Sequence, residues 1–310
     1  MRPGPVVAEV FPSTYQTNQA PRGAPGQEST INMSATGQAI RHTFLLCSPE
    51  HYVIDYIINP WMEKNFHSAK TDKAMAQWEA FRDALAARAN VVMAEPLPPL
   101  PDYCFVANAA LVYKKAAIIA QFRPKERRPE EPHFKEWFQR NGYDVPTIPS
   151  DVFFEGAGDA LLDRGRDATL FMGHGIRTQA EAAAPIGEAM DLEVHPLRLV
   201  DPRFYHLDTC FCPLTGGNAL YFPGGFDDES RARLESYYAP EKRFAVEEED
   251  ALGFACNAVD TGSAVLLNKA GDALQARLRS WGLEPVITPL TEFLLAGGAA
   301  KCLTLRLDEP

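Results

Sequence analysis

The sequence predicts an α/β protein assembled from repeated units, each made of two short strands and a helix. Pairs of apolar, strand-like runs recur along the chain, and each pair flanks residues that favour a tight turn. Stretches with apolar residues at helical spacing separate these pairs. Equivalent positions recur roughly every fifty residues, a period typical of units that stack as a propeller or an array. The alternative is an ordinary α+β protein, in which hairpins and helices also alternate.

The beginning of the chain, Met1 to Ser34, differs in composition from the rest of the sequence. It is rich in Pro, Gly, Ser, Thr, Gln and Asn, and its apolar residues show no periodicity. We expect a disordered or loosely attached arm here and a single domain over residues 35–310. The first elements of that domain are a buried strand, Thr43 to Cys47, and an amphipathic helix, Ala74 to Ala89, with apolar residues at helical spacing.

Four hairpins and four helices come next along the chain. The predicted strand pairs are Cys104 to Tyr113 with Ala116 to Phe122, Gly158 to Leu162 with Ala168 to Met172, Thr209 to Leu214 with Ala219 to Phe222, and Phe254 to Val259 with Ala264 to Leu267. The predicted helices are Pro132 to Asn141, Arg177 to Glu188, Glu229 to Ala239, and Asp272 to Trp281. The last unit is short, so we expect the strand Thr43 to Cys47 to pair with it and close a ring.

Charge and cysteine usage restrict the function. The formal net charge of −11 leaves no basic stripe for phosphates, so we expect no nucleic-acid or membrane partner and favour a small cationic ligand. No apolar run has the length of a membrane span, and no secretory leader is apparent. The six cysteines are expected to be free thiols in a reducing cytoplasm. Cys210 and Cys212 form only C-x-C, so we expect no metal and no cofactor. Oligomeric state is not indicated.

Two segments carry candidate chemistry. In His206-Leu207-Asp208, an extended backbone would place the imidazole and the carboxylate on one face, a proton-transfer group beside an anion. Cys302 follows a double glycine, and a cysteine nucleophile needs a histidine that the fold brings to it. The equivalent positions of the repeat are Asn108, Gly158, Asp208, Asn257 and Cys302. In a ring these turns face one axis. We therefore expect Asn108, Glu155, Asp159, His206, Asp208 and Cys302 to meet in a central pocket.

Several longer stretches resemble one known family. They are Tyr56-Ile57-Ile58-Asn59-Pro60-Trp61-Met62, Pro101-Asp102-Tyr103-Cys104-Phe105-Val106-Ala107-Asn108, Phe154-Glu155-Gly156-Ala157-Gly158-Asp159, Gly173-His174-Gly175-Ile176-Arg177-Thr178, Phe204-Tyr205-His206-Leu207-Asp208-Thr209, and Gly297-Gly298-Ala299-Ala300-Lys301-Cys302-Leu303-Thr304. From Thr43 onward the chain resembles the guanidine-modifying, or pentein, superfamily, which includes arginine deiminases, dimethylarginine dimethylaminohydrolases, arginine dihydrolases and glycine amidinotransferases. The resemblance implies a five-bladed α/β-propeller of ββαβ units.

The resemblance also implies roles for the candidate residues. Cys302 would attack the planar guanidinium carbon and form a covalent thiouronium, and His206 would protonate the departing amine and then activate water. Glu155 and Asp208 would hold the guanidinium nitrogens. A guanidinium is a poor electrophile, so the reaction needs an anionic cradle and a thiolate. Further implied substrate-binding positions are Asn59, Asp102, Asn108, Asp159, Arg177 and Arg128. Arg127 also matches a carboxylate-binding position, but for Arg127 and Arg128 a solvated charge run is the alternative.

Two departures from the family pattern bear on the product. One extra residue separates Glu155 from Asp159, so either a bulge redirects Glu155 or Asp159 shares the cradle. Asn108 stands where many relatives carry an aspartate; an amide both donates and accepts, and need not reject a neutral ureido product. We therefore expect hydrolysis of arginine to ornithine, ammonia and carbon dioxide. The alternatives are a hydrolase releasing citrulline, an amidinotransferase, and a non-catalytic binding module on the same fold.

Overall fold

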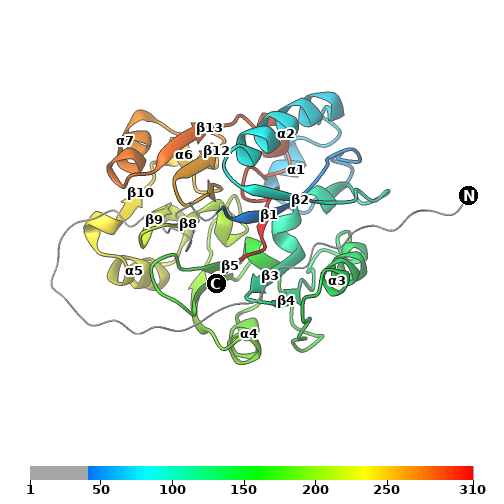
Figure 1. Cartoon of the computed structure of the whole chain (residues 1–310), viewed down its shortest axis with the longest axis horizontal. Coiled ribbons are helices and arrows are strands. Elements are labelled where there is room, and N and C mark those ends of the chain that lie inside the picture. Colours follow the sequence, from blue (N-terminus) through cyan, green and yellow to red (C-terminus); the bar gives the residue numbers. More distant parts are fainter. Residues whose placement is uncertain (1–40, 310) are drawn as a thin grey trace, which may run out of the picture. The chain divides into compact units, whose positions relative to one another are not determined.

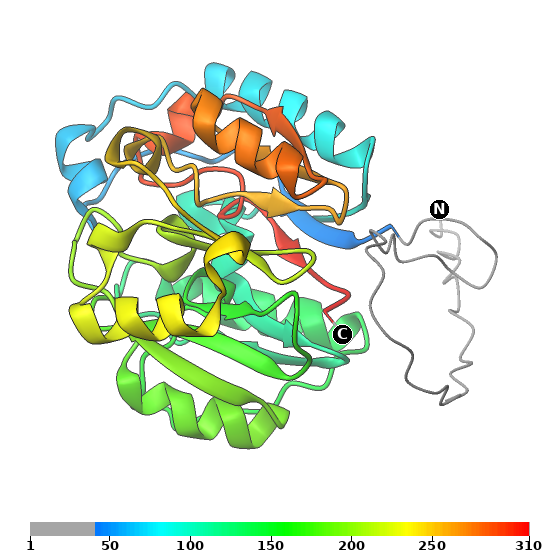
Figure 2. The ribbon, with the colours of Figure 1, turned by 90° about the vertical axis from the view of Figure 1, so that its left-hand side faces the viewer.

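The computed structural model describes residues 41–309, and the predicted arm, Met1 to Ser34, lies outside the described residues. Within that range the strands form five small sheets placed around a common centre, with the longer helices at the periphery (Figures 1 and 2). This is the predicted α/β-propeller. No helix in the described part of the chain is long and apolar enough to cross a membrane.

Four of the five sheets contain three strands, and each combines an antiparallel pair with one parallel neighbour. Three of these consist of β5 (Ala160–Leu162), β6 (Thr169–His174) and β7 (Glu193–Arg198); β8 (Phe211–Leu214), β9 (Asn218–Tyr221) and β10 (Arg243–Ala245); and β11 (Val259–Asp260), β12 (Ala264–Leu267) and β13 (Glu284–Ile287). The two-stranded sheet is the hairpin of β3 (Ala110–Tyr113) and β4 (Ala116–Ile119), which replaces the parallel strand with a single bridge from Ala116 to Asp144.

The remaining sheet closes the ring. β1 (Thr43–Cys47) pairs in parallel with β2 (Asn90–Ala94) and antiparallel with β14 (Leu305–Arg306). The predicted pairing between the first strand and the last unit is therefore confirmed. It brings the segment that carries Cys302 back to the centre of the molecule (Figure 1).

The helices cover the outside of the ring because each has one apolar face. The longer ones are α2 (Thr71–Ala86), α3 (Glu131–Arg140), α4 (Ala183–Met190), α5 (Asp228–Tyr237) and α7 (Asp272–Ser280), and the short ones are α1 (Pro60–Lys64), α6 (Glu248–Leu252) and α8 (Thr291–Leu294). In α2, for example, Trp78, Phe81 and Leu85 follow the expected spacing and are buried.

The inner ends of the hairpins differ from the sequence-based prediction. The strands predicted from Cys104, Gly158, Thr209 and Phe254 start later, at Ala110, Ala160, Phe211 and Val259. Before the first three of them the chain forms 3-10 turns, at Pro101–Cys104, Val106–Ala109, Gly156–Gly158 and Leu207–Thr209. Burial favours apolar residues in a central turn as strongly as in a strand, so the two were not distinguishable by pattern. The parallel strands β2, β7, β10 and β13 were not predicted, because most of their residues are partly or fully exposed and form no buried apolar run.

The triplet His206-Leu207-Asp208 is not a continuous extended strand. His206 has an extended backbone, but the 3-10 turn begins at Leu207, so the alternation of an extended strand does not apply. The expectation that His206 and Asp208 project side by side is therefore wrong. The turn instead directs the two side chains to different partners.

Candidate active site

The inner 3-10 turns and the segment before β14 bring the sequence-predicted residues to one buried region. Asn108, Glu155, His206, Asp208 and Cys302 are each at most 3% exposed. They come from four separate parts of the chain, so the ring assembles the site. Three of them, Asn108, His206 and Cys302, line a cavity of ≈ 280 Å³, and Glu155 and Asp208 lie behind its wall. The cavity is lined by Ile58, Asn59, Met62, Asp102, Phe105, Asn108, Arg127, Arg177, Tyr205, His206, Ala296, Gly298 and Cys302.

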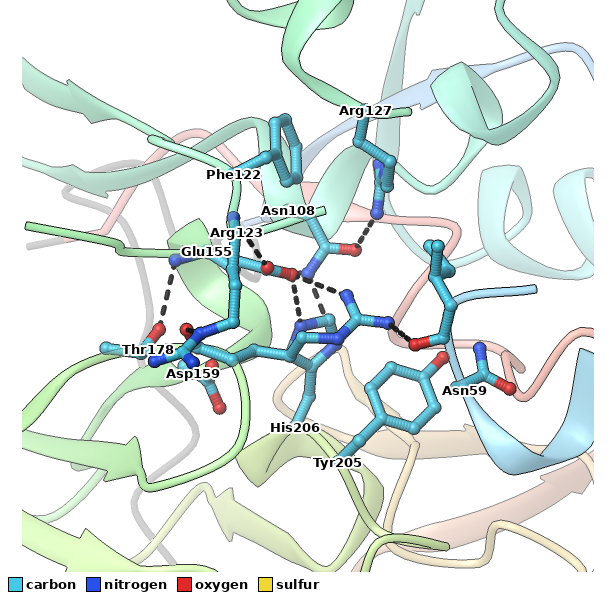
Figure 3. Close-up of polar contacts among 12 residues, drawn as sticks. Asn59, Asn108, Phe122, Arg123, Arg127, Glu155, Asp159, Thr178, Tyr205 and His206 are labelled. Carbon is cyan, nitrogen blue, oxygen red and sulfur yellow. Dashed lines mark hydrogen bonds and ion pairs between the residues drawn. The ribbon is translucent and has the colours of Figure 1, made fainter. Parts of the chain in front are cut away.

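His206 is held from behind by a carboxylate. Its Nε2 lies 2.7 Å from Glu155 Oε2, and the same oxygen accepts a hydrogen bond of 2.8 Å from Arg177 Nη1 (Figure 3). Burial alone raises the pKa of Glu155, but Arg177 and His206 outweigh it and lower the pKa to about 2. Glu155 is therefore ionised and fixes the orientation of the imidazole.

Glu155 does not line the cavity. It is fully buried and its carboxylate is occupied by Arg177, His206 and the backbone N–H of Arg123. The expectation that Glu155 holds the substrate guanidinium is corrected by these contacts, since the protein's own cation already fills that position. The residues after Glu155 form the 3-10 turn Gly156–Gly158, in which Gly156 has a φ of +61°, and a Cβ there would come within 2.7 Å of Asn108 O.

Cys302 is fixed by an asparagine and faces a second carboxylate. Asn257 Nδ2 donates to Cys302 Sγ at 3.1 Å, and Asn257 Oδ1 accepts from the Cys302 backbone N–H at 3.1 Å. On its other side Sγ lies 3.6 Å from Asp208 Oδ2. Burial and then Asp208 raise the pKa of the Cys302 thiol above its usual range, so in the empty cavity it is protonated. Asn257 had been recognised only as a repeat position, and its contact with Cys302 was not anticipated.

Asp208 and Asp102 each offer a buried oxygen with no hydrogen-bond partner among the described residues, Oδ1 in both cases. Burial raises the pKa of Asp208 to about 7, and burial also raises that of Asp102. A cationic ligand would satisfy these oxygens and favour their ionised forms. Asp159 lies elsewhere: its Oδ1 accepts from the Leu207 backbone N–H at 2.9 Å, and it supports the turn after His206 instead of lining the cavity.

Asn108 has a fixed amide orientation. Its Oδ1 accepts from Arg127 Nη1 at 2.8 Å, and its Nδ2 donates to Glu155 O at 3.2 Å and lies 3.5 Å from His206 Nδ1 (Figure 3). Gly158 is required beside it, because a Cβ at that position would be 2.2 Å from Asn108 Nδ2. The amide therefore lies against the imidazole at the cavity wall.

Of the three candidate arginines, Arg127 and Arg177 line the cavity and Arg128 does not. Arg127 is 3% exposed and forms a bidentate pair with Glu130, through Nε at 2.8 Å and Nη2 at 2.7 Å, so the solvated charge run is the wrong alternative for this residue. Arg177 lines the cavity with its guanidinium 4.7 Å from the Tyr205 ring centroid. Arg128 instead donates to Phe122 O and Arg123 O and does not line the cavity.

Asn59 contributes from the start of α1. Its Oδ1 accepts from the backbone N–H groups of Trp61 and Met62, and its Nδ2 donates to Ala296 O at 3.0 Å. It therefore caps the helix and ties it to the glycine segment before Cys302. Among residues 41–309 no three His, Cys, Asp or Glu side chains are grouped as metal ligands would be.

Known proteins share this chain's sequence and fold, although no protein-family model matches it. The bifunctional arginine dihydrolase/ornithine cyclodeaminase AgrE of Nostoc sp. is 52% identical over 271 residues, which cover 87% of this chain and 38% of that protein. The chain thus spans well under half the length of that relative. The N(G),N(G)-dimethylarginine dimethylaminohydrolase of Mycobacterium tuberculosis is 34% identical, with 90% of this chain and 92% of that protein covered.

A solved structure agrees with the sequence relatives. It is the N-terminal domain of ArgZ, an arginine dihydrolase of the ornithine–ammonia cycle in cyanobacteria, crystallised as a Cys-to-Ser variant bound to substrate. It is 47% identical, has a TM-score of 0.85, and covers 87% of this chain and 99% of that domain. The likeness to these proteins extends over nearly the whole described chain, and the chain therefore belongs to the guanidine-modifying, or pentein, superfamily, which includes the arginine dihydrolases and the dimethylarginine dimethylaminohydrolases.

Proposed function

We propose that the chain hydrolyses the guanidino group of L-arginine to ornithine, two molecules of ammonia and carbon dioxide, with two molecules of water consumed. The observation that carries the proposal is the junction of Cys302, His206 and the Asn108 amide on one buried cavity. The similarity to arginine dihydrolases at 47–52% identity supports the choice of substrate. The ligand is a small molecule, and the six free thiols support a reducing compartment, which we infer to be the cytoplasm.

The first half of the reaction uses the cysteine and the histidine. The Cys302 thiol gives its proton to His206, and the thiolate attacks the guanidinium carbon, forming a C–S bond. The imidazolium returns the proton to the departing amino group, and the C–N bond breaks to release ammonia. His206 then takes a proton from water, and the hydroxide adds to the thiouronium carbon. The C–S bond breaks as His206 returns that proton to the departing sulfur, and the added oxygen loses its proton to solvent to leave a neutral ureido group.

The substrate cation supplies part of the activation. Burial and then Asp208 hold the pKa of Cys302 above its usual range, so a guanidinium bound next to Asp208 would offset the second of these effects and favour the thiolate. Nucleophile formation is thereby coupled to binding. Among the other charged residues that line the cavity, Asp102 suits the α-ammonium group of the substrate and Arg177 its α-carboxylate.

Asn108 decides the product in this proposal. An aspartate would bind a guanidinium but would repel the carbonyl oxygen of a ureido product. The Asn108 amide is neutral and oriented by Arg127, so the ureido group is retained for a second hydrolysis to ornithine.

A product assay tests the proposal. Purified enzyme is incubated with arginine, and with Nω,Nω-dimethylarginine and an amine acceptor in parallel, and the amino acids are separated. We expect ornithine and two equivalents of ammonia. Citrulline as the end product, turnover of methylated arginine alone, or transfer of the amidino group would each support a rival enzyme. Cys302→Ser should lose at least roughly 10³-fold in kcat, and full turnover by this variant, or no turnover of any guanidino compound by wild type, would favour the binding module.

A further inference from the structure

A buried ion pair lies next to Asn108 at the wall of the substrate cavity. Arg127 and Glu130 are 3% and 1% exposed, and both belong to the turn that precedes α3. Arg127 Nε and Nη2 donate to the two oxygens of the Glu130 carboxylate, at 2.8 and 2.7 Å. Arg127 lines the cavity, whereas Glu130 does not. Glu130 therefore supports Arg127 from behind the cavity wall.

The Arg127 guanidinium is held in one orientation. Besides its two bonds to Glu130, it donates through Nη2 to the Asp102 carbonyl at 3.2 Å, and its carbon lies 4.5 Å from the Phe122 ring centroid. The remaining nitrogen, Nη1, donates to Asn108 Oδ1 at 2.8 Å. A planar guanidinium that is bound through all three nitrogens cannot turn without breaking several hydrogen bonds. The amide oxygen of Asn108 therefore faces a fixed donor.

The two ends of the Asn108 amide have partners of opposite kind. Arg127 can only donate and requires Oδ1, whereas the Glu155 carbonyl can only accept and, at 3.2 Å, requires Nδ2. An amide turned by 180° would face a donor with its N–H groups and an acceptor with its oxygen. Nδ2 also lies 3.5 Å from His206 Nδ1 (Figure 3). Asn108 thus presents an N–H, and not its oxygen, on the His206 side of the cavity.

A donor at this place distinguishes the two molecules that occupy the site in the proposed reaction. Every nitrogen of a guanidinium donates, so an N–H of Asn108 finds no acceptor in the guanidinium group of arginine. A ureido group has a carbonyl oxygen, which accepts. An amide whose oxygen was free to face the ligand would favour the guanidinium instead. The orientation of the Asn108 amide therefore affects which of the two ligands binds more tightly.

We propose that Glu130 and Arg127 form a positioning pair, which holds the Asn108 amide as a hydrogen-bond donor toward the reacting group. The pair thereby favours the ureido group over the guanidino group and retains citrulline for the second hydrolysis. This inference deepens the proposed function and rests on it in placing the reacting group beside Asn108. Glu130 does not line the cavity and is therefore not a catalytic residue.

Binding of citrulline and of arginine without turnover tests the inference. Both dissociation constants are measured by isothermal titration calorimetry in Cys302→Ser, with and without Glu130→Gln. The titrations are made at pH 8, because burial raises the pKa of Glu130 to about 7. Both ligands carry the same α-ammonium and α-carboxylate groups, so any contact of Arg127 with those groups cancels in the ratio of the two constants. We expect Glu130→Gln to raise the ratio of the citrulline constant to the arginine constant about tenfold, equivalent to one hydrogen bond.

The chain offers a matched control and a variant that leaves no buried charge without a partner. Arg164 and Glu309 form another bidentate ion pair, which does not line the cavity, so Glu309→Gln should leave the ratio unchanged. The double variant Arg127→Met, Glu130→Met replaces both charged groups by apolar side chains of similar volume, a change that buried ion pairs often tolerate. It frees Asn108 Oδ1 and should raise the ratio as Glu130→Gln does.

An unchanged ratio in folded Glu130→Gln, or in the double variant if Glu130→Gln does not fold, would overturn the inference. A failure of Cys302→Ser to bind citrulline, or an equal rise of the ratio in Glu309→Gln, would also overturn it. The product assay tests the proposed function separately. If wild type releases citrulline as its end product while the ratio rises as expected, the proposed product fails and the role of the Glu130–Arg127 pair stands.

Discussion

Glu155 and Asp208 are both fully buried carboxylates, and each contacts a residue that lines the cavity, His206 or Cys302, yet their surroundings give them opposite electrostatics. Glu155 lies between Arg177 and His206, and its pKa is about 2. Asp208 faces the Cys302 thiol and the Asn257 amide, and burial raises its pKa to about 7. Burial is the same for both, so the partners decide the charge. Glu155 is therefore a carboxylate that orients a histidine, whereas Asp208 is a carboxylate suited to binding a cation.

The largest expected effect comes from removing the charge of Glu155. Glu155→Gln should lower kcat for arginine by roughly 10³-fold, because His206 loses the anion that orients and stabilises its protonated form. The same change leaves Arg177 buried without a counter-charge and should reduce the free energy of unfolding by about 3 kcal/mol.

Steady-state kinetics and urea unfolding measure both effects. Glu136→Gln is the matched control, since Glu136 pairs with Arg140 at the surface of α3 and should change stability by less than about 1 kcal/mol. Retained kcat in Glu155→Gln would mean that the carboxylate is structural only.

Removing the charge of Asp208 should have two smaller effects of opposite sign, one on catalysis and one on the reactivity of Cys302. Asp208→Asn should lower kcat/KM for arginine by about 100-fold, since the cation loses a charged hydrogen-bond acceptor. The same substitution removes the charge that raises the pKa of Cys302, so alkylation of the free enzyme should become faster at pH 8. Steady-state kinetics and iodoacetamide labelling of the same variant measure these two effects. A fall in both rates would show that Asp208 activates the thiol instead of binding the cation.

The smallest effect is on the pH dependence of the free energy of unfolding, to which Asp208 and Glu155 contribute in opposite directions. The pKa of Asp208 is raised from 3.8 to about 7 on folding, so the native state holds a proton that the unfolded chain has lost, and this contribution to stability disappears as pH rises from about 4 to 7. The pKa of Glu155 is lowered from 4.5 to about 2, so its contribution is present above pH 4.5 and disappears as pH falls toward 2.

Urea unfolding at several pH values distinguishes the two. Relative to wild type, Asp208→Asn should gain about 2 kcal/mol of stability between pH 5 and pH 8. Glu155→Gln should show its largest deficit near neutral pH and its smallest near pH 3. The same pH dependence in both variants would contradict the assignment of two different environments.

The sequence by itself determined the repeat, the residues on its axis and the closing of the ring. Turn chemistry and apolar spacing are local, so hairpins such as β3–β4 and helices such as α2 followed from neighbouring residues. The recurrence of Asn108, Asp208, Asn257 and Cys302 at one position of each unit predicted that they would meet. Asp208, Asn257 and Cys302 contact one another, and Asn108 lines the same cavity as Cys302.

Only the tertiary structure decided which carboxylate does what. The sequence predicted that the His206 and Asp208 side chains project together and that Glu155 binds the substrate guanidinium. The 3-10 turn at Leu207 instead separates the His206 and Asp208 side chains, and Arg177 binds the Glu155 carboxylate. Arg177 follows β6 of the same blade that Glu155 precedes, 22 residues along the chain, and His206 comes from the next blade. Such long-range ion pairs have no local signature. The electrostatics of the site therefore depend on packing between blades, where low dielectric makes each partner's charge decisive.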